Sequence, residues 1–574
     1  MTRERTNDFA VDGTPLAWSA LDRDRELDRA AATDVDLVIL GGGITGAGIA
    51  REAALRGIPF LLVDKDDFAA GTSSRSSKLV HGGMRYLAQR DFALVRESTT
   101  ERNWLCAALP NLVRPIRFHY CGYLGGKDTP GRVRLALRLY DLLSNTFSRY
   151  RMPRHELLAP EELRRREPAV RAEGVAMAGD YYDANVDDAR LTMEVLKEAR
   201  DLSGGRSAAL NYVEALAIRE AAPGLREVDL RDAFTGRAFT VRARCVVNAT
   251  GVWAGGTLAR AGGPSGLIRP TKGVHLAVPN ARVGNREAFV MRSLDDGRSF
   301  FVLRRGDITL IGTTDTDYQG PLEAPFCTAE DADYLLRTVN ARFPEARLTR
   351  DDVLSTYAGI RPLVRQEGVG ASSVSRRHVV RDEGGGLVTV AGGKLTTFRL
   401  MAWDVLRTCS ARGYLRPLGR KEAKRHFSRR PLKAGLAWEA FGAALRRLDL
   451  EGLLPGPALR HLHQQYGQGA LRILAAVKAD PGSGRPILEG HPWCAAEIEH
   501  ILAYENAPTL MDVMLRRTEM QMIVSHRDQP ALAAGVARIL ARAYDWDQAR
   551  TDRELADYLA YVRRTILFER DAHA

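Results

Sequence analysis

One stretch near the start of the chain decides the fold: Asp36-Leu37-Val38-Ile39-Leu40-Gly41-Gly42-Gly43-Ile44-Thr45-Gly46. Its apolar, β-branched first half predicts a buried parallel strand. The glycines predict a tight turn, and residues 47–56 predict a helix that ends before Gly57. A second apolar run over residues 60–63 predicts the next strand. The folded part of the chain therefore begins with a β-α-β unit of about 30 residues.

The turn of this unit has the spacing of a dinucleotide-binding site. Gly41, Gly43 and Gly46 form the pattern G-x-G-x-x-G, which permits a tight turn and a close approach of the backbone to a pyrophosphate at the helix N-terminus. Asp64 ends the second strand, at about the 20-residue spacing of the acid that binds a ribose hydroxyl. We predict dinucleotide binding; the alternative is a glycine-rich turn without a ligand.

Composition narrows the class of protein. The 574 residues suffice for roughly three or four domains, and the net charge of +12 suits an anionic partner such as a phosphorylated substrate, a nucleic acid or an acidic membrane surface. The six cysteines form no C-x-x-C pair and have no zinc-ligand spacing, so we predict no metal site and reduced thiols in the cytoplasm.

Two further features concern membranes and the N-terminal end. No run approaches the roughly 20 apolar residues of a membrane-spanning helix. Residues 1–33 contain many acids and bases and no apolar core, so they resemble neither a signal peptide nor a transit peptide. We expect a flexible, loosely structured extension there.

A second motif favours FAD over NAD. Residues 227–245 predict a β-hairpin, and the strand that follows ends in Asn248-Ala249-Thr250-Gly251. This turn is similar to the second signature of FAD folds that have two dinucleotide-binding motifs. Taken alone it is a common turn composition, but together with the first motif it indicates FAD.

The segment from Gly71 to Leu87 predicts a loop around the cofactor. It is rich in serine and threonine and contains Lys78 and the pair Gly82-Gly83. Such a loop offers many hydrogen-bond donors with little steric bulk, which suits ribityl oxygens and a diphosphate. The alternative is a solvated polar loop.

Residues 41–87 also resemble the N-terminal region of the aerobic, FAD-dependent glycerol-3-phosphate dehydrogenases. Further segments resemble motifs of that family in the same order, and the resemblance covers about residues 34–545. These segments are residues 186–191, 271–275, 311–315, 357–363, 391–399 and 508–518. Several motifs in the same order are far more specific than any one of them.

The resemblance implies an α/β fold with a discontinuous Rossmann-like FAD-binding domain, an α+β substrate or cap domain and a C-terminal all-helical domain. We expect the FAD-binding domain at residues 34–110, 186–260 and 356–405, the cap domain at 111–185 and 261–355, and the helical domain at 406–574. It also implies non-covalent FAD, although His81 is a conceivable point of covalent attachment. The predicted cofactor-binding residues are Gly41, Gly43, Gly46, Asp64, Thr72, Ser73, Ser77, Lys78, Leu79, His81, Gly82, Gly83, Thr250, Gly251, Gly393, Leu395 and Thr396.

The implied reaction is hydride transfer from C2 of sn-glycerol 3-phosphate to the flavin. Two arginines are implied to bind the phosphate, a task that suits the planar, permanently charged guanidinium. His275 is the first candidate for the base, and Arg361 or Lys394 can instead stabilise the alkoxide by charge. The predicted substrate-binding residues are Arg85, Tyr86, Arg361, Arg376 and Lys394, and the predicted catalytic residues are His275, Arg361 and Lys394.

The chain departs from the family pattern at a few positions. Arg304-Arg305 stands where relatives often have Pro-Trp, Arg377 stands where they often have an acid, and the loop over residues 364–373 differs in length and charge. The rival enzymes are a glycerol-3-phosphate oxidase that uses oxygen and, more distantly, an amine or amino-acid oxidase. A nucleic-acid-binding flavoprotein is disfavoured because the sequence has no RNP run, zinc knuckle or aromatic-basic stripe.

The number of dinucleotide-binding motifs bears on which molecule accepts the electrons. FAD fills the G-x-G-x-x-G motif, and the sequence has no second such motif for NAD. The resemblance implies a membrane quinone, reached by a cytoplasmic enzyme bound peripherally to the inner face of the cell membrane through anionic lipid. Residues 510–520 are one candidate for the contact, with a solvated helix face as the alternative, and a homodimer remains open.

Overall fold

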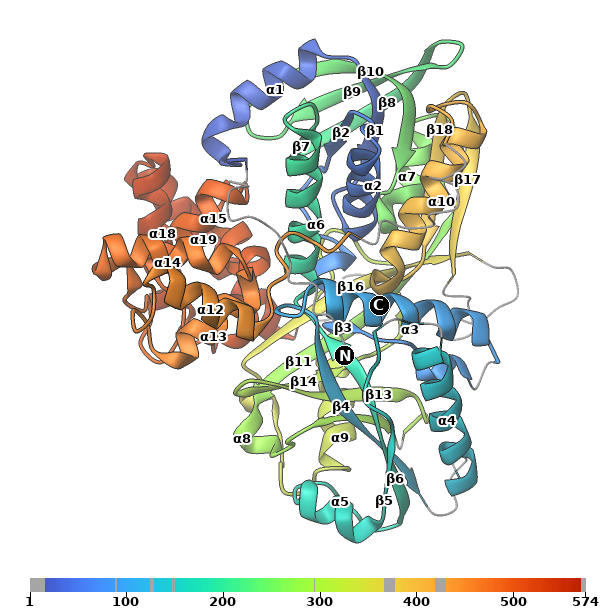
Figure 1. Cartoon of the computed structure of the whole chain (residues 1–574), viewed down its shortest axis with the longest axis vertical. Helices are drawn as coiled ribbons and strands as arrows, with labels where there is room; N and C mark the ends of the chain where they lie inside the picture. The colour runs from blue at the N-terminus through green and yellow to red at the C-terminus, as the bar shows by residue number, and fades with distance from the viewer. Residues whose placement is uncertain are drawn as a thin grey trace.

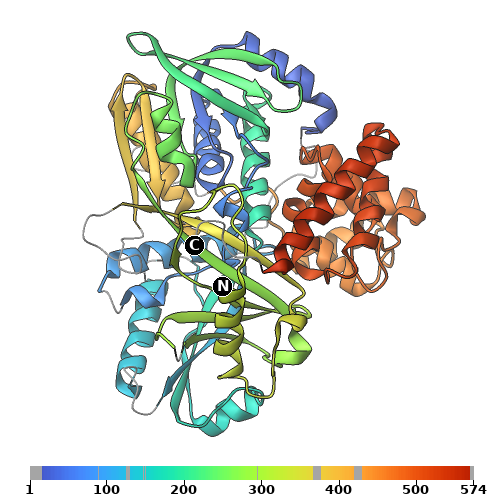
Figure 2. The same cartoon turned by 180° about the vertical axis from the view of Figure 1, so that it is seen from behind.

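The computed structural model describes residues 16–87, 90–123, 129–146, 148, 150–293, 295–365, 377–418 and 430–568. Two sheet-based regions are stacked along the long axis of the molecule, and a helical domain lies against one side of both (Figures 1 and 2). The chain crosses between the two sheets several times, so neither is built from one continuous segment. The predicted α/β fold class with a C-terminal helical domain is confirmed.

Within the described residues, the first sheet has 8 strands, in the order β17-β18-β10-β1-β2-β7, with β8 and β9 extending from β10. Strands β18, β10, β1, β2 and β7 run parallel, and helices α6 and α10 pack against α2 beside them. The predicted β-α-β unit is confirmed as β1, α2 and β2, and the predicted hairpin as β9 and β10. The bounds are β1 Val35–Leu40, α2 Ile44–Leu55, β2 Phe60–Val63, α6 Asp188–Ser203, β7 Ala208–Leu210, β8 Val213–Ala222, β9 Leu225–Asp232, β10 Ala238–Asn248, α7 Ala254–Ala259, β17 His378–Gly384, β18 Leu387–Gly392 and α10 Phe398–Ala411.

The second sheet has 10 strands among the described residues, in the order β15-β11-β14-β13-β12-β4-β6-β3, with β16 on β11 and β5 on β6. Strand β16 pairs along its whole length with β11, although the sequence prediction placed residues 356–405 in the FAD-binding domain. The second sheet thus continues to Val364. The bounds are β3 Leu79–Val80, α3 Phe92–Ala108, β4 Arg114–Tyr123, α4 Pro130–Thr146, β5 Glu156–Leu158, α5 Pro160–Arg166, β6 Val175–Asn185, β11 Ile268–Pro279, α8 Asn280–Val283, β12 Ala288–Arg292, β13 Ser299–Arg305, β14 Ile308–Gly312, β15 Thr316–Asp317, α9 Ala329–Asn340 and β16 Ser355–Val364.

The expectation of a loosely structured N-terminal extension is wrong for residues 16–32; residues 1–15 lie outside the described part. Residues Ala20–Asp22 form a short 3-10 helix, and Arg23–Ala32 form α1. Trp18 is buried, and its backbone N–H donates to the Ala503 carbonyl at 2.9 Å. Arg23 pairs with the buried carboxylate of Asp232 at 2.5 Å. Contacts with residues far along the chain hold this segment in place. Its polar composition alone does not predict those contacts.

The C-terminal helices have an apolar core of their own. Their docking on the first sheet uses charge: Asp67, which follows β2, accepts from Arg516 at 2.6 Å and from Arg517 at 2.8 Å. All three side chains are buried, so the two arginines of residues 510–520 face neither solvent nor a membrane surface. The bounds are α12 Trp438–Leu448, α13 Gly456–Tyr466, α14 Gly469–Ala479, α15 Ala495–Tyr504, α16 Leu510–Asp512, α17 Met520–Ile523, α18 Gln529–Tyr544 and α19 Gln548–Leu567.

Two departures from the family pattern lie within the part of the chain that the structure describes. Both form ion pairs. Arg305, at the end of β13, pairs with Glu519 of the helical domain through contacts of 2.6 Å. Arg377 pairs with Asp91, at the start of α3, at 2.8 Å. Arg305 therefore joins the second sheet to the helical domain, and Arg377 links the start of β17 to α3. None of the described helices is long and apolar enough to cross a bilayer.

Candidate functional site

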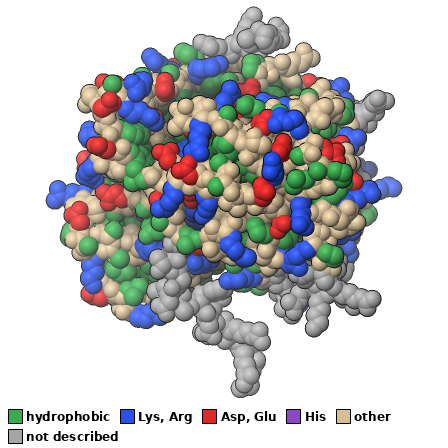
Figure 3. All heavy atoms as spheres, turned by 90° about the horizontal axis from the view of Figure 1, so that it is seen from above, with side chains coloured by type: hydrophobic (Ala, Val, Ile, Leu, Met, Phe, Trp, Pro, Cys, Tyr) green, Lys and Arg blue, Asp and Glu red, His purple; other side chains and the backbone are tan. Residues whose placement is uncertain are grey.

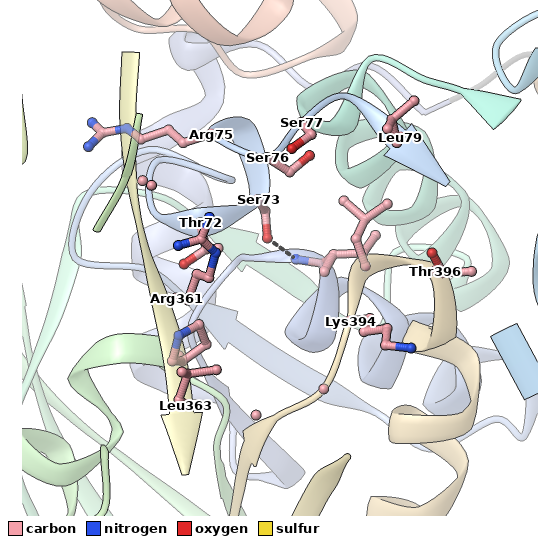
Figure 4. A pocket seen from close by; sticks show the side chains of 18 of the residues that line it. Thr72, Ser73, Arg75, Ser76, Ser77, Leu79, Arg361, Leu363, Lys394 and Thr396 are labelled. Atoms are coloured by element: carbon pink, nitrogen blue, oxygen red, sulfur yellow. Dashed lines mark hydrogen bonds between the residues drawn. The ribbon is translucent and has the colours of Figure 1, made fainter. Parts of the chain in front are cut away.

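A cavity of about 1420 Å³ lies between the two sheets, at the carboxyl ends of β1, β2, β10 and β18. Parallel strands of a doubly wound sheet place their ligand at this edge. The volume exceeds the roughly 300–1,000 Å³ of a usual small-molecule pocket, as a dinucleotide together with a second ligand requires. Figure 4 shows Thr72 and Ser73 on one wall and Arg361 and Lys394 on opposite sides of the space.

The glycine turn has the shape that a pyrophosphate needs. Gly41 adopts a φ of +106°, and a Cβ there would lie 2.6 Å from the Ala249 carbonyl oxygen. A Cβ on Gly46 would lie 1.9 Å from the carbonyl oxygen of Gly41, so any side chain would push the helix off the turn. Gly41 and Gly43 line the cavity, whereas Gly46 packs beneath the turn. The residues present therefore fit a dinucleotide at the start of α2.

Asp64 is the ribose-binding candidate at the end of β2. Its carboxylate accepts from the backbone N–H of Gly42 at 2.6 Å and of Asp66 at 3.0 Å, which fixes it beside the turn. Burial raises the pKa of Asp64 to about 7. A ribose with two hydroxyl donors supplies hydrogen bonds that favour the charged carboxylate and oppose this effect of burial.

The polar loop after Gly71 only partly follows the prediction. Ser73 accepts from the Ile44 N–H at 2.9 Å, the bond drawn in Figure 4, and so ties the loop to the helix start. Lys78, in contrast, pairs with buried Asp188 at 2.5 Å and donates to the Ser74 carbonyl at 3.0 Å. Its ammonium is therefore not among the groups that line the cavity. The predicted cofactor-binding residues that do line it are Gly41, Gly43, Asp64, Thr72, Ser73, Ser77, Leu79, His81, Gly83, Thr250, Gly251, Gly393, Leu395 and Thr396.

A buried cluster behind the Gly82-Gly83 turn was missed by sequence reasoning. Asp183 Oδ1 accepts from the Gly82 N–H at 2.8 Å, from Arg102 at 2.5 Å and from the Tyr140 hydroxyl at 2.7 Å. A Cβ on Gly82 would lie 2.3 Å from that hydroxyl oxygen, so Gly82 contacts the cluster instead of the cavity. We call Arg102, Tyr140 and Asp183 the turn clamp. Its members come from three separate elements, and no local pattern marks them.

Arg361, on β16, lies at the cavity wall. Its guanidinium donates to Asp315 Oδ1, Thr313 Oγ1 and the Thr314 carbonyl, each at 2.9 Å. Residues 313–315 were recognised as a motif but received no role. The guanidinium is thus held in one orientation at the cavity wall by the turn after β14. The motif was the available signal: three polar residues directly after a buried strand.

Lys394 follows β18 and approaches the cavity from the other side. Its ammonium donates to Ser98 Oγ at 3.1 Å and lies 4.0 Å from the centroid of the Tyr86 ring. Lys394 and Tyr86, both predicted to bind the substrate, therefore contact each other beside the Gly83 turn. For Arg85 only the backbone position, in the 3-10 helix Met84–Leu87, is described. Arg376 lies outside the described residues, so its predicted phosphate contact stays a prediction.

His275, on β11, is fully enclosed at the cavity wall. Its Nε2 lies 2.8 Å from Ser77 Oγ, and its ring stacks on Tyr357 with centroids 4.8 Å apart. Its Nδ1 has no hydrogen-bond partner in the described part of the chain. Burial, reinforced by the positive charges of Arg361 and Lys78, lowers the pKa of His275 to about 3. The imidazole is therefore neutral at pH 7.

Among the described residues, no group of three His, Cys, Asp or Glu could hold a metal ion.

Known proteins resemble this chain over nearly its whole length. The family described as FAD dependent oxidoreductase matches residues 36–399, and the C-terminal domain of alpha-glycerophosphate oxidase matches residues 433–551. A glycerol-3-phosphate dehydrogenase of Synechocystis sp. is 33% identical over 562 residues, 93% of this chain and 97% of the relative. The aerobic glycerol-3-phosphate dehydrogenase of Bacillus subtilis is 33% identical over 549 residues, 92% and 95% of the two chains. The solved glycerol-3-phosphate dehydrogenase of Bacillus halodurans, complexed with FAD, superposes with a TM-score of 0.76 at 28% identity, over 96% of this chain and 99% of that one.

Proposed function

Because the chain belongs to the FAD-dependent glycerol-3-phosphate dehydrogenases, we propose that it oxidises sn-glycerol 3-phosphate to dihydroxyacetone phosphate and that a membrane quinone receives the electrons. FAD is the cofactor of this family, and we propose that it is held without a covalent bond. The observation that carries the substrate is Arg361, a guanidinium fixed at the wall of a cavity whose other end fits a dinucleotide.

Arg361 binds the substrate phosphate in this proposal. Its guanidinium keeps a permanent positive charge at the cavity wall. Its terminal N–H groups already donate to Asp315, Thr313 and the Thr314 and Lys272 carbonyls, so it attracts the phosphate through its charge. Thr313 and the Thr314 carbonyl keep the guanidinium oriented before substrate arrives. Asp315 is also bonded to it, so phosphate and carboxylate share one guanidinium. Substrate binding therefore places two anions, the phosphate and Asp315, beside Arg361. Replacing Arg361 removes the positive charge that both of them need.

The reaction removes a hydride from C2 and a proton from the C2 hydroxyl. FAD, when bound, accepts the hydride. His275 accepts the proton in this proposal, because its neutral imidazole lies at the cavity wall. Burial opposes the imidazolium, but a bound phosphate is an opposite charge that favours it. Lys394 stabilises the developing charge on the C2 oxygen from the other side of the cavity.

Anaerobic mixing of the purified protein with sn-glycerol 3-phosphate tests the proposal. We expect the flavin absorbance to bleach with this substrate and to remain with glycerol, which lacks the phosphate. Acid precipitation should leave the flavin in the supernatant; flavin in the protein pellet would show a covalent link. No bleaching by glycerol 3-phosphate in protein with full FAD content overturns the substrate assignment.

The acceptor is tested separately, with a short-chain quinone analogue and with oxygen after the flavin has been reduced. We expect rapid reoxidation by the quinone and slow reoxidation by oxygen. We place the enzyme at the inner face of the cell membrane, where a lipid-dissolved quinone is available. Equal rates with oxygen and quinone would replace the quinone assignment with an oxidase activity.

A further inference from the structure

Helix α4, at the edge of the second sheet (Figure 1), turns large apolar side chains toward solvent. Leu135 is 59% exposed and Leu142 is 57% exposed, and partly buried Leu139 lies between them. The spacing of 135, 139 and 142 places the three on one face of a helix. Phe92, at the start of the neighbouring α3, is 45% exposed. The opposite end of the molecule differs: in Figure 3 basic and acidic side chains are interspersed there.

Arginines border this apolar face. Arg132, Arg134 and Arg138 are exposed on α4. The acid of the helix, Asp141, is already bonded to His155, with Oδ2 and Nδ1 2.6 Å apart. The face therefore combines leucines with positive charge, the combination by which an amphipathic helix binds an anionic lipid surface.

The same face is continuous with the cavity. Phe92, Arg132, Leu135 and Leu139 line the cavity and also belong to the exposed face or its border. Gly83 and Lys394 line the same cavity, and Lys394 lies close to the Gly83 turn. Phe92, Leu135 and Leu139 thus give an apolar reactant a surface to follow into the cavity, beside Arg90 and Arg132. A water-soluble acceptor does not require such a path.

We propose that this face of α4 (Leu135, Leu139, Leu142, Arg134 and Arg138) rests on an anionic bilayer and holds the cavity mouth against it. The leucines enter the acyl region and the arginines contact lipid phosphates. The inference deepens the proposed function, because it rests on an acceptor dissolved in the membrane. It differs from an interface between two copies of the chain, which the same leucines could also serve and which the experiment separates.

The experiment uses the FAD-containing full chain and vesicles of phosphatidylcholine mixed with phosphatidylglycerol. The test variants are Leu142→Glu and the double variant Arg134→Glu/Arg138→Glu, because these side chains are exposed and do not line the cavity. The matched controls are Leu21→Glu, whose side chain is 70% exposed before α1, and Arg25→Glu on α1. We expect the test variants to lower co-sedimentation at least tenfold and the controls to leave it unchanged.

Flavin bleaching by glycerol 3-phosphate separates this inference from the proposed function. We expect all variants to bleach like the wild type, while turnover with a long-chain quinone in the vesicles falls with sedimentation. Wild-type sedimentation of Leu142→Glu refutes the inference even when bleaching is normal. A shift from dimer to monomer in that variant, with unchanged sedimentation, assigns the face to a second copy of the chain. Absence of bleaching in the wild type refutes the proposed function and leaves the sedimentation result to be read by itself.

Discussion

Replacement of Arg361 by alanine is the most direct test of the phosphate site. The side chain loses bonds to Asp315, Thr313 and Thr314 in the structure and, in our proposal, a charge-assisted pair with the substrate. Loss of such a pair in a partly enclosed site costs about 2–4 kcal/mol. Since each 1.4 kcal/mol is a factor of ten, kcat/KM for glycerol 3-phosphate should fall roughly 30- to 1000-fold. Most of the loss should appear in KM, because phosphate contacts are made before the reaction begins.

The assay is steady-state oxidation of glycerol 3-phosphate with a soluble artificial acceptor, with the FAD content measured in parallel. Arg269→Ala is the matched control: Arg269 also lies on the second sheet, pairs with Asp317 at 2.7 Å, and does not line the cavity. We expect the control to change KM little, because exposed ion pairs contribute little. An unchanged KM in Arg361→Ala would falsify the assignment. Recovery of the wild-type KM in Arg361→Ala/Asp315→Ala would show that Arg361 serves only to neutralise Asp315.

Three further changes test other parts of the structure. Asp183→Ala leaves buried Arg102 without its ion partner, so the free energy of unfolding in urea should fall by about 3–5 kcal/mol and FAD should be released faster; Asp183→Asn should lose less. Burial lowers the pKa of His119, on β4, but its hydrogen bond to Asp180 and the nearby carboxylate of Glu167 raise it overall, to about 9. Its stabilisation is therefore complete below pH 6.5 and lost as the pH rises to 9, and the fall in unfolding free energy over this range should be smaller in His119→Gln. Asp67→Asn should lower the unfolding free energy by about 3–5 kcal/mol and speed proteolysis of the helical domain; resistance equal to the wild type contradicts the docking role.

The part of the fold that local pattern specifies was predictable. The run before Gly41 is apolar because its strand is buried in the middle of the first sheet, and Gly41 and Gly46 are glycines because a Cβ would meet backbone oxygen. Strand β16 was misplaced for the opposite reason. Its sequence is that of any buried strand, and only its pairing with β11 assigns it to the second sheet.

The candidate site shows the same division. Residues in recognisable motifs, such as Arg361 and Lys394, do reach one cavity. The turn clamp was not predictable, because Arg102 and Asp183 lie far apart in the sequence and become partners only when α3 packs on β6. Lys78 misled for a related reason: it lies in the predicted cofactor loop, but a buried carboxylate on α6 captures its ammonium. The motifs therefore predicted the backbone turns better than they predicted where individual side chains point.

The charge-based docking of the helical domain has a consequence for the order in which the protein becomes native during its synthesis. Asp67 leaves the ribosome long before Arg516 and Arg517, its partners in the finished protein. Burial raises the pKa of a lone carboxylate, and in the finished protein the two arginines outweigh that effect and hold the pKa of Asp67 below its usual range. Until they arrive, the wall of the first sheet around Asp67 carries a charge that favours water over burial. A nascent chain that stops before residue 516 should therefore keep this wall open to chaperones, and release from them should coincide with completion of the chain.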